Sequence, residues 1–218
     1  IASDWRCVNP RAISRLPAAS YARSCRSAED NKVQGELAVA FSSDQMGIIR
    51  ASALALALAA ASLGAGYVWL PPGLFELNPA MDFGERIAFA LKADILVFIW
   101  LAGCVGAVSR GRFYSPTDIE GSAFGPPSRA IAVRAAVLQN SLEQTVLAFG
   151  GHLILAALLR GLELTLIPLL VALFLVGRVA FAFGYAKGAS GRAFGMALTA
   201  ASIIVSYGLA VGLVVVGR

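Results

Sequence analysis

Five long apolar segments occupy most of the 218-residue chain, and they constrain its fold more than any other feature. Each is close to the roughly 20 residues that a helix needs to cross the hydrocarbon core of a bilayer. The segments run over about 47–70, 85–108, 129–158, 163–187 and 192–216. Backbone groups in hydrocarbon need internal hydrogen-bond partners, and a helix supplies them within one segment. The sequence therefore predicts an all-α integral membrane protein with five transmembrane helices.

The composition and the charge distribution agree with a membrane protein and exclude a nucleic-acid partner. The chain is 58% hydrophobic and 14% charged, and its net charge is +5. Its basic residues do not gather into a stripe with interleaved aromatic residues, as nucleic-acid binding requires. If the segments alternate, one side of the membrane receives Arg50, Arg110, Arg112, Arg129, Arg134, Lys187 and Arg192, and the other receives Arg86, Arg160 and Arg218. The positive-inside rule makes the first side cytoplasmic, and we expect a multi-pass protein of a bacterial inner membrane.

The segment 1–45 differs from the rest of the chain because it is polar and contains no long apolar run. Five arginines and several serines lie in its first 26 residues, with Asp4 as the only acid before Glu29. This pattern is compatible with a transit peptide and also with a disordered or non-native extension. Met46 directly precedes the first apolar segment. We expect 1–45 to be an extension and 46–218 to be the transmembrane domain.

Ionisable and amide side chains interrupt the last three apolar segments. Asn140 and Glu143 are three residues apart, so both leave the same face of one helix. Arg178 and Tyr185 share a face of the next helix, and Arg192 opens the last segment. A charge in the middle of a bilayer costs roughly 3 kcal/mol or more, so such residues are functional candidates.

These five side chains suit a small zwitterionic or anionic ligand at the cytoplasmic side. A carboxylate can bind an amine, and guanidinium groups can bind a carboxylate or thiolate. The alternative is that Glu143 and Arg178 are each other's buried counter-ions and only hold helices together. His152 is interpreted as a hydrogen-bonded core or interfacial residue, whereas Lys92 and Asp94 are expected to extend toward the interface. The cysteines show neither metal-ligand nor disulfide spacing, and no metal set, catalytic triad or phosphate loop is present.

Two sequence stretches resemble the MAPEG family, the membrane-associated proteins of eicosanoid and glutathione metabolism. They are "LQNSLEQ" at 138–144 and "LVGRVAFAFGYAKGASGRAFG" at 175–195. The resemblance covers roughly 95–216. It implies a MAPEG-like four-helix bundle core, assembled as a homotrimer, with the segment 47–70 as one extra N-terminal transmembrane helix.

The resemblance also implies a glutathione site between subunits. Asn140 and Glu143 match the pair that holds the glutamyl end of glutathione in the family. Arg178 and Tyr185 match an arginine and a tyrosine seven residues apart on the following helix. Arg192 matches the arginine that stabilises the thiolate in catalytic members. Glutathione is thus the expected co-substrate, with membrane lipids and a lipophilic small molecule as further partners.

The sequence also departs from the family pattern. Catalytic members usually carry an arginine at the position of Ala136, and Arg134 lies about 120° around the helix from Asn140. Gln144 and Phe181 stand where some relatives have tyrosine. Two functions therefore remain open at this point: a glutathione transferase or peroxidase acting on lipophilic substrates, and a non-catalytic lipid- or partner-binding membrane protein of the same fold.

Overall fold

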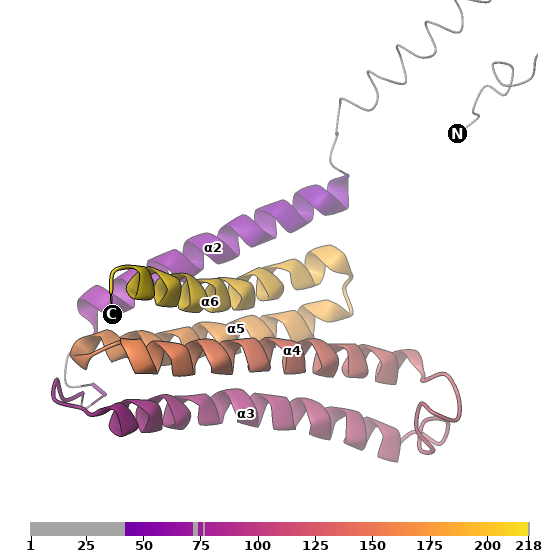
Figure 1. Cartoon of the computed structure of the whole chain (residues 1–218). Coiled ribbons are helices and arrows are strands. Elements are labelled where there is room, and N and C mark those ends of the chain that lie inside the picture. The colour runs from indigo at the N-terminus through magenta and orange to yellow at the C-terminus, as the bar shows by residue number, and fades with distance from the viewer. Residues whose placement is uncertain (1–41, 72–73, 76, 218) are drawn as a thin grey trace, which may run out of the picture. The chain divides into compact units, whose positions relative to one another are not determined.

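The structure is a computed structural model that describes residues 42–217 except 72, 73 and 76. Within those residues it is all-α, with five helices long and apolar enough to cross a membrane (Figure 1). They are α2 (Ser43–Trp69), α3 (Phe83–Phe113), α4 (Arg129–Leu158), α5 (Leu166–Tyr185) and α6 (Ala189–Val215), with the 3-10 turn η3 (Gly161–Thr165) before α5. The all-helical membrane fold predicted from the apolar segments is confirmed.

The helix ends differ from the expected bounds by a few residues where capping or charge extends a helix beyond its apolar run. Helix α3 begins after Asp82, which forms a capping box with Glu85. It continues to Phe113 because Arg110 and Arg112 in its last turn favour the negative end of the helix dipole. Helix α2 begins at Ser43, so the last three residues of the expected extension 1–45 are helical. The expectation for 1–41 lies outside the described residues.

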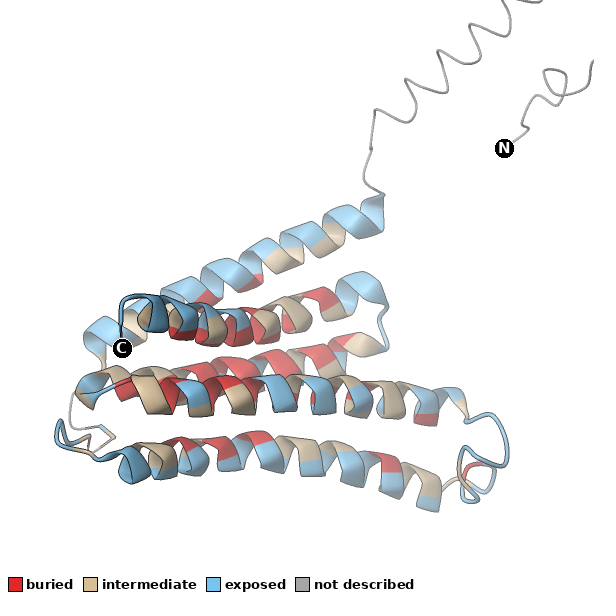
Figure 2. Ribbon diagram, in the orientation of Figure 1, coloured by how far each residue is buried: buried red, intermediate tan, exposed pale blue. Residues whose placement is uncertain are grey.

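Helices α3 to α6 form a four-helix bundle, and α2 packs along its outside. The buried residues gather where α4, α5 and α6 face one another, whereas most of α2 is exposed (Figure 2). Ala55 and Ala59 of α2 pack against a cluster that includes Leu173, Leu198 and Ala201 of α5 and α6. The architecture is therefore the expected bundle with one additional N-terminal helix.

Glycine allows α5 and α6 to approach each other very closely. A Cβ on Gly177 would lie 2.5 Å from Thr199 Oγ1, and one on Gly195 would lie 2.2 Å from Phe181 N. A Cβ on Gly184 would lie 2.0 Å from the carbonyl oxygen of Gly191. Close backbone contact replaces the hydrophobic effect as a driving force between helices in lipid. These three glycines consequently fix the α5–α6 pair, which carries Arg178, Tyr185 and Arg192.

A compact loop joins α3 to α4 at the basic end of the bundle. Asp118 is buried there and accepts hydrogen bonds from the hydroxyl of Ser115 and, at 2.7 Å, from the backbone N–H of Ser128. These hydrogen bonds lower the pKa of the Asp118 carboxyl to about 2, with the Ser115 hydroxyl making the largest contribution. The ionised carboxylate thus ties the end of α3 to the start of α4.

The distribution of basic residues predicts which loops face the cytoplasm. Phe124 in the α3–α4 loop is 80% exposed, and Leu74 in the α2–α3 connection is 54% exposed. In a background without native cysteines, Leu74→Cys should react with a membrane-impermeant thiol reagent on intact cells, and Phe124→Cys should react only after permeabilisation. Strong labelling of Phe124→Cys on intact cells would contradict the predicted orientation and indicate the opposite one.

Candidate functional site

Arg178, in the middle of α5, is completely buried, and its contacts are neutral groups. Its Nη1 donates to Asn140 Oδ1 of α4 at 2.8 Å, and its Nε donates to Thr199 Oγ1 of α6 at 3.2 Å. The guanidinium carbon lies 4.3 Å from the ring centroid of Phe181, within the range of a cation–π interaction. No carboxylate of the described residues forms an ion pair with it. Arg178 therefore joins three helices through hydrogen bonds and aromatic contact.

The local geometry explains why Thr199 can reach this arginine. Gly177 and Gly195 bring α5 and α6 together beside Thr199. The Thr199 hydroxyl donates its own proton to the carbonyl oxygen of Gly195 at 2.9 Å, which leaves its oxygen free to accept from Arg178. The orientation of the hydroxyl is thus set by the helix backbone.

Tyr185 and Arg192 lie together where α5 ends and α6 begins. The guanidinium carbon of Arg192 is 4.7 Å from the ring centroid of Tyr185. Tyr185 in turn packs edge-to-face against Phe181, with 5.3 Å between the ring centroids. The contacts form a continuous column from Arg178 through Phe181 and Tyr185 to Arg192. This column connects the buried arginine to a partly exposed one.

Glu143 does not join this group within one chain. Its side chain is exposed, and its Oε1 accepts a hydrogen bond from Gln139 Nε2 at 2.9 Å. The interpretation of Glu143 and Arg178 as mutual counter-ions is therefore wrong, because Arg178 points to Asn140 in the interior while Glu143 leaves the outer surface of α4. Asn140 and Glu143 lie on neighbouring parts of the α4 surface. Asn140 faces the bundle interior, whereas Glu143 faces outward.

The structure adds a buried pair that the sequence reasoning missed. Asp94 of α3 and His152 of α4 are both fully buried, with 2.6 Å between Asp94 Oδ1 and His152 Nδ1. The expectation that Asp94 extends toward the interface is wrong, although Lys92 is exposed. An acid and a lone histidine in two apolar segments were a signal for pairing. Asp94 Oδ2 and His152 Nε2 have no hydrogen-bond partner.

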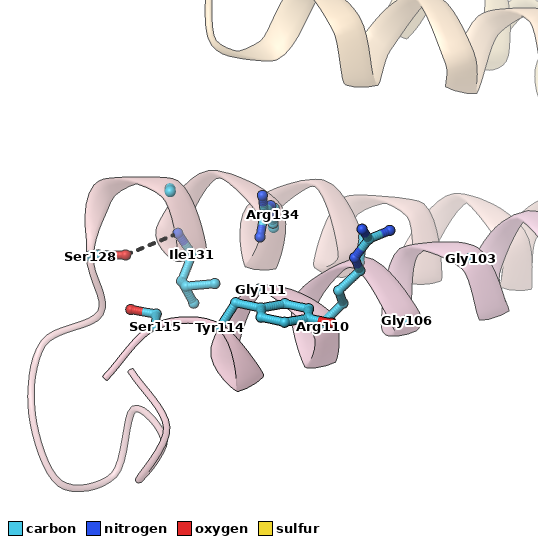
Figure 3. Close-up of a pocket in the computed structure, with 11 residues that line it drawn as sticks. Gly103, Gly106, Arg110, Gly111, Tyr114, Ser115, Ser128, Ile131 and Arg134 are labelled. Carbon is cyan, nitrogen blue, oxygen red and sulfur yellow. Dashed lines mark hydrogen bonds between the residues drawn. The ribbon is translucent and has the colours of Figure 1, made fainter. Parts of the chain in front are cut away.

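A cleft opens between the basic ends of α3 and α4 (Figure 3). Its larger part has a volume of about 730 Å³, and its lining includes Arg110, Tyr114, Ser115, Ser128 and Arg134. An adjoining apolar part has a volume of about 520 Å³, and its lining includes Ile99, Trp100, Cys104, Val137 and Ala182. Among the described residues, no cluster of three or more histidine, cysteine or acidic side chains is placed to hold a metal ion.

Comparison with known proteins gives one family match and three partial relatives. The model of the MAPEG family matches residues 87–212, which span α3 to α6 and leave α2 outside. Heme A synthase of Methylorubrum populi is 35% identical over 109 residues, and heme A synthase of Methylorubrum extorquens is 33% identical over 108 residues. Each alignment covers 48% of this chain and 28% of the relative, so the chain spans little more than a quarter of the length of those proteins. No solved structure matches.

The Arg178–Asn140 contact predicts a non-additive pair of substitutions. Asn140→Leu alone leaves a buried guanidinium donor without its partner, and we expect it to cost about 1–3 kcal/mol of stability. Arg178→Met alone leaves the Asn140 side-chain oxygen without its hydrogen-bond donor. The double variant should lose clearly less than the sum of the two, because neither polar partner remains. Thermal unfolding in detergent measures this, with Gln139→Leu on the exposed face as control; additive losses would contradict a direct interaction.

Proposed function

Because the chain belongs to the MAPEG family, we propose that it is a glutathione-dependent transferase or peroxidase that acts on lipophilic substrates within the bilayer. The observation that carries this proposal is the position of Arg192. Its guanidinium is held on the Tyr185 ring, is partly exposed, and forms no ion pair with a carboxylate of the described residues. A cation with these properties is available to a thiolate.

The start of α6 adds to the positive potential around Arg192. The N-cap residue is Gly188, and no side chain caps the first turn of the helix. Uncapped backbone N–H groups and the helix dipole favour an anion at this end. A thiol placed here would lose its proton to water more readily. The thiolate would then form a carbon–sulfur bond while a leaving group such as a halide ion departs from the carbon. With a peroxide it would attack one oxygen, break the O–O bond and release the other oxygen as an alcohol that takes its proton from water, which leaves a sulfenic acid on the sulfur. Arg192 and the helix terminus would stabilise the anionic sulfur before that step.

Asn140 and Glu143 would bind the peptide part of glutathione. Since a guanidinium only donates hydrogen bonds, the contact from Arg178 identifies Asn140 Oδ1 as the acceptor and leaves the Nδ2 amide free to donate to a ligand. Glu143 presents its carboxylate on the outer surface of α4, where it can accept from an ammonium group. The two side chains thus offer complementary groups to a zwitterionic peptide.

The exposure of Glu143 supports a homotrimer with the site completed by a neighbouring subunit. A carboxylate that faces acyl chains from within a membrane helix is costly. Contact with another subunit and a bound ammonium group would remove that cost.

The Methylorubrum relatives support the expectation of a bacterial inner membrane.

One observation favours the second candidate function, a non-catalytic lipid- or partner-binding protein. Phe181 lies on the guanidinium of Arg178, which is fully buried, so a ligand cannot reach that arginine in this conformation. Ala136 adds no cation in its place. A failure to bind glutathione would select this candidate.

The Glu143 carboxylate should contribute to glutathione affinity. Glu143→Gln keeps the shape of the side chain and removes its charge, so we expect glutathione binding to weaken about tenfold, the scale of one charge-assisted hydrogen bond. Calorimetry in detergent measures the affinity, and chemical crosslinking checks that the oligomer persists. Glu120→Gln in the α3–α4 loop makes the same chemical change away from the site and should leave binding unchanged.

Arg192 should affect the reaction more than binding. Arg192→Ala should lower turnover roughly 10²-fold, as for the loss of one electrostatic stabiliser, and should raise the pKa of bound glutathione. Lys187→Ala removes an equal charge from the adjoining α5–α6 connection and serves as the control. Thiolate absorbance and conjugation of an aryl halide are the measurements. If wild type and Ala136→Arg both show no glutathione binding and no thiolate signal, the transferase proposal fails.

A further inference from the structure

We propose that the cleft between α3 and α4 is a binding site for one anionic phospholipid, with the headgroup at the basic end and an acyl chain in the apolar part. The two parts of the cleft share Gly103, Ala107 and Arg134, so they are continuous. This inference is independent of glutathione, because none of the proposed glutathione-site residues lines the cleft.

The headgroup part offers cations and hydroxyls without a lining carboxylate. Arg110 extends from α3 toward α4, and Arg134 lies on the facing helix (Figure 3). Both side chains are exposed, and neither forms an ion pair with a carboxylate of the described residues. Tyr114 and Ser128 add hydroxyl groups to the same lining, whereas the Ser115 hydroxyl donates to Asp118. Two guanidinium groups with hydroxyls between helices suit a phosphodiester.

The nearby acid helps to build this part of the cleft. The Asp118 carboxylate accepts from the Ser115 hydroxyl and the Ser128 backbone, so its oxygens are occupied by the loop. Arg112 is likewise held by the loop, since its Nη2 donates to Ser122 Oγ at 2.8 Å. Asp118 thereby positions two lining residues, while Arg110 and Arg134 remain for a ligand.

The tail part continues from the headgroup part into the membrane span. Ile99, Trp100, Val133 and Val137 give it apolar walls on α3 and α4, and Ala182 of α5 closes it. A free phosphate or a short peptide has no apolar chain to place there. A molecule with one charged end and one hydrocarbon end matches both parts at once. The basic end is the predicted cytoplasmic side, where an inner-leaflet lipid presents its headgroup at this depth.

Glycine keeps the cleft open. A Cβ on Gly103 or on Gly106 would have no atom within 4 Å, so helix packing does not require glycine at either position. Gly111, five residues after Gly106, is different, because a Cβ there would clash with Arg134 Nη1. Interior glycine costs a helix about 1 kcal/mol relative to alanine. The two unopposed glycines therefore lower the intrinsic stability of α3 and widen the groove.

Trp100 provides a direct reporter because it lines the apolar part. The full chain carrying Trp5→Phe and Trp69→Phe retains Trp100 as its single tryptophan. It is reconstituted into phosphatidylcholine vesicles that contain a tenth of dibrominated lipid, either phosphatidylglycerol or phosphatidylcholine. Bromine quenches a nearby indole, so a specific site gives stronger quenching by the anionic lipid at equal mole fraction. Equal quenching by the two lipids overturns the proposal.

Variants separate the site from general attraction of lipid to a basic surface. Arg110→Gln with Arg134→Gln should weaken the preference for phosphatidylglycerol on the order of tenfold, whereas Arg129→Gln, an exposed cation outside the lining, should leave most of it. Gly103→Leu should fill the cleft and abolish the preference, whereas Gly208→Leu, which is also unopposed, should not. Size-exclusion chromatography verifies assembly of each variant.

Loss of the preference in Arg129→Gln alone, or full retention in both cleft variants, overturns the proposal. Removal of the quenching difference by millimolar inorganic phosphate would identify a soluble anion as the occupant and also overturns it.

Discussion

The burial of one guanidinium group in the middle of the bundle determines the arrangement of the surrounding helices. A charge in hydrocarbon is tolerated only when its donors are satisfied. Arg178 meets this condition through Asn140 on α4, Thr199 on α6 and the ring of Phe181 on its own helix. A shift of any of these helices by one residue would leave a donor without an acceptor. The register of α4, α5 and α6 is thus coupled to one side chain.

A chain of side-chain contacts also connects the buried Arg178 to the partly exposed Arg192. Phe181 contacts both Arg178 and Tyr185, and Tyr185 carries Arg192. Glycine at 177, 184 and 195 allows the close α5–α6 contact that holds this column together. The exposed arginine is consequently supported by packing that begins at the bundle centre. The Arg192 guanidinium therefore keeps its position without being enclosed.

The sequence predicted most of the fold because a bilayer permits few alternatives. Apolar length and backbone hydrogen bonding specify transmembrane helices, and the spacing of Arg178 and Tyr185 correctly put them on one face of α5. Spacing within one helix does not show which part of that helix faces the bundle interior. The sequence therefore did not show that Asn140 points inward while Glu143 is exposed. The Asp94–His152 contact joins residues 58 positions apart. The two polar residues in apolar segments indicate that each needs a partner, but no local pattern specifies that they pair with each other. The subunit contact proposed for Glu143 cannot be read from local sequence spacing either, because it would involve a second chain.

The Asp94–His152 pair has a consequence for the biogenesis of the protein. Ribosomal synthesis delivers Asp94 to the membrane 58 residues before His152 exists. Until then a lone carboxylate in α3 opposes lateral release into lipid by about 3 kcal/mol, the cost of an aspartate at the centre of a membrane helix. That opposition decreases once α4 arrives and its imidazole contacts one carboxylate oxygen. The pairing therefore favours release of α3 and α4 from the translocon together, as a helical hairpin, over their release as two successive single spans.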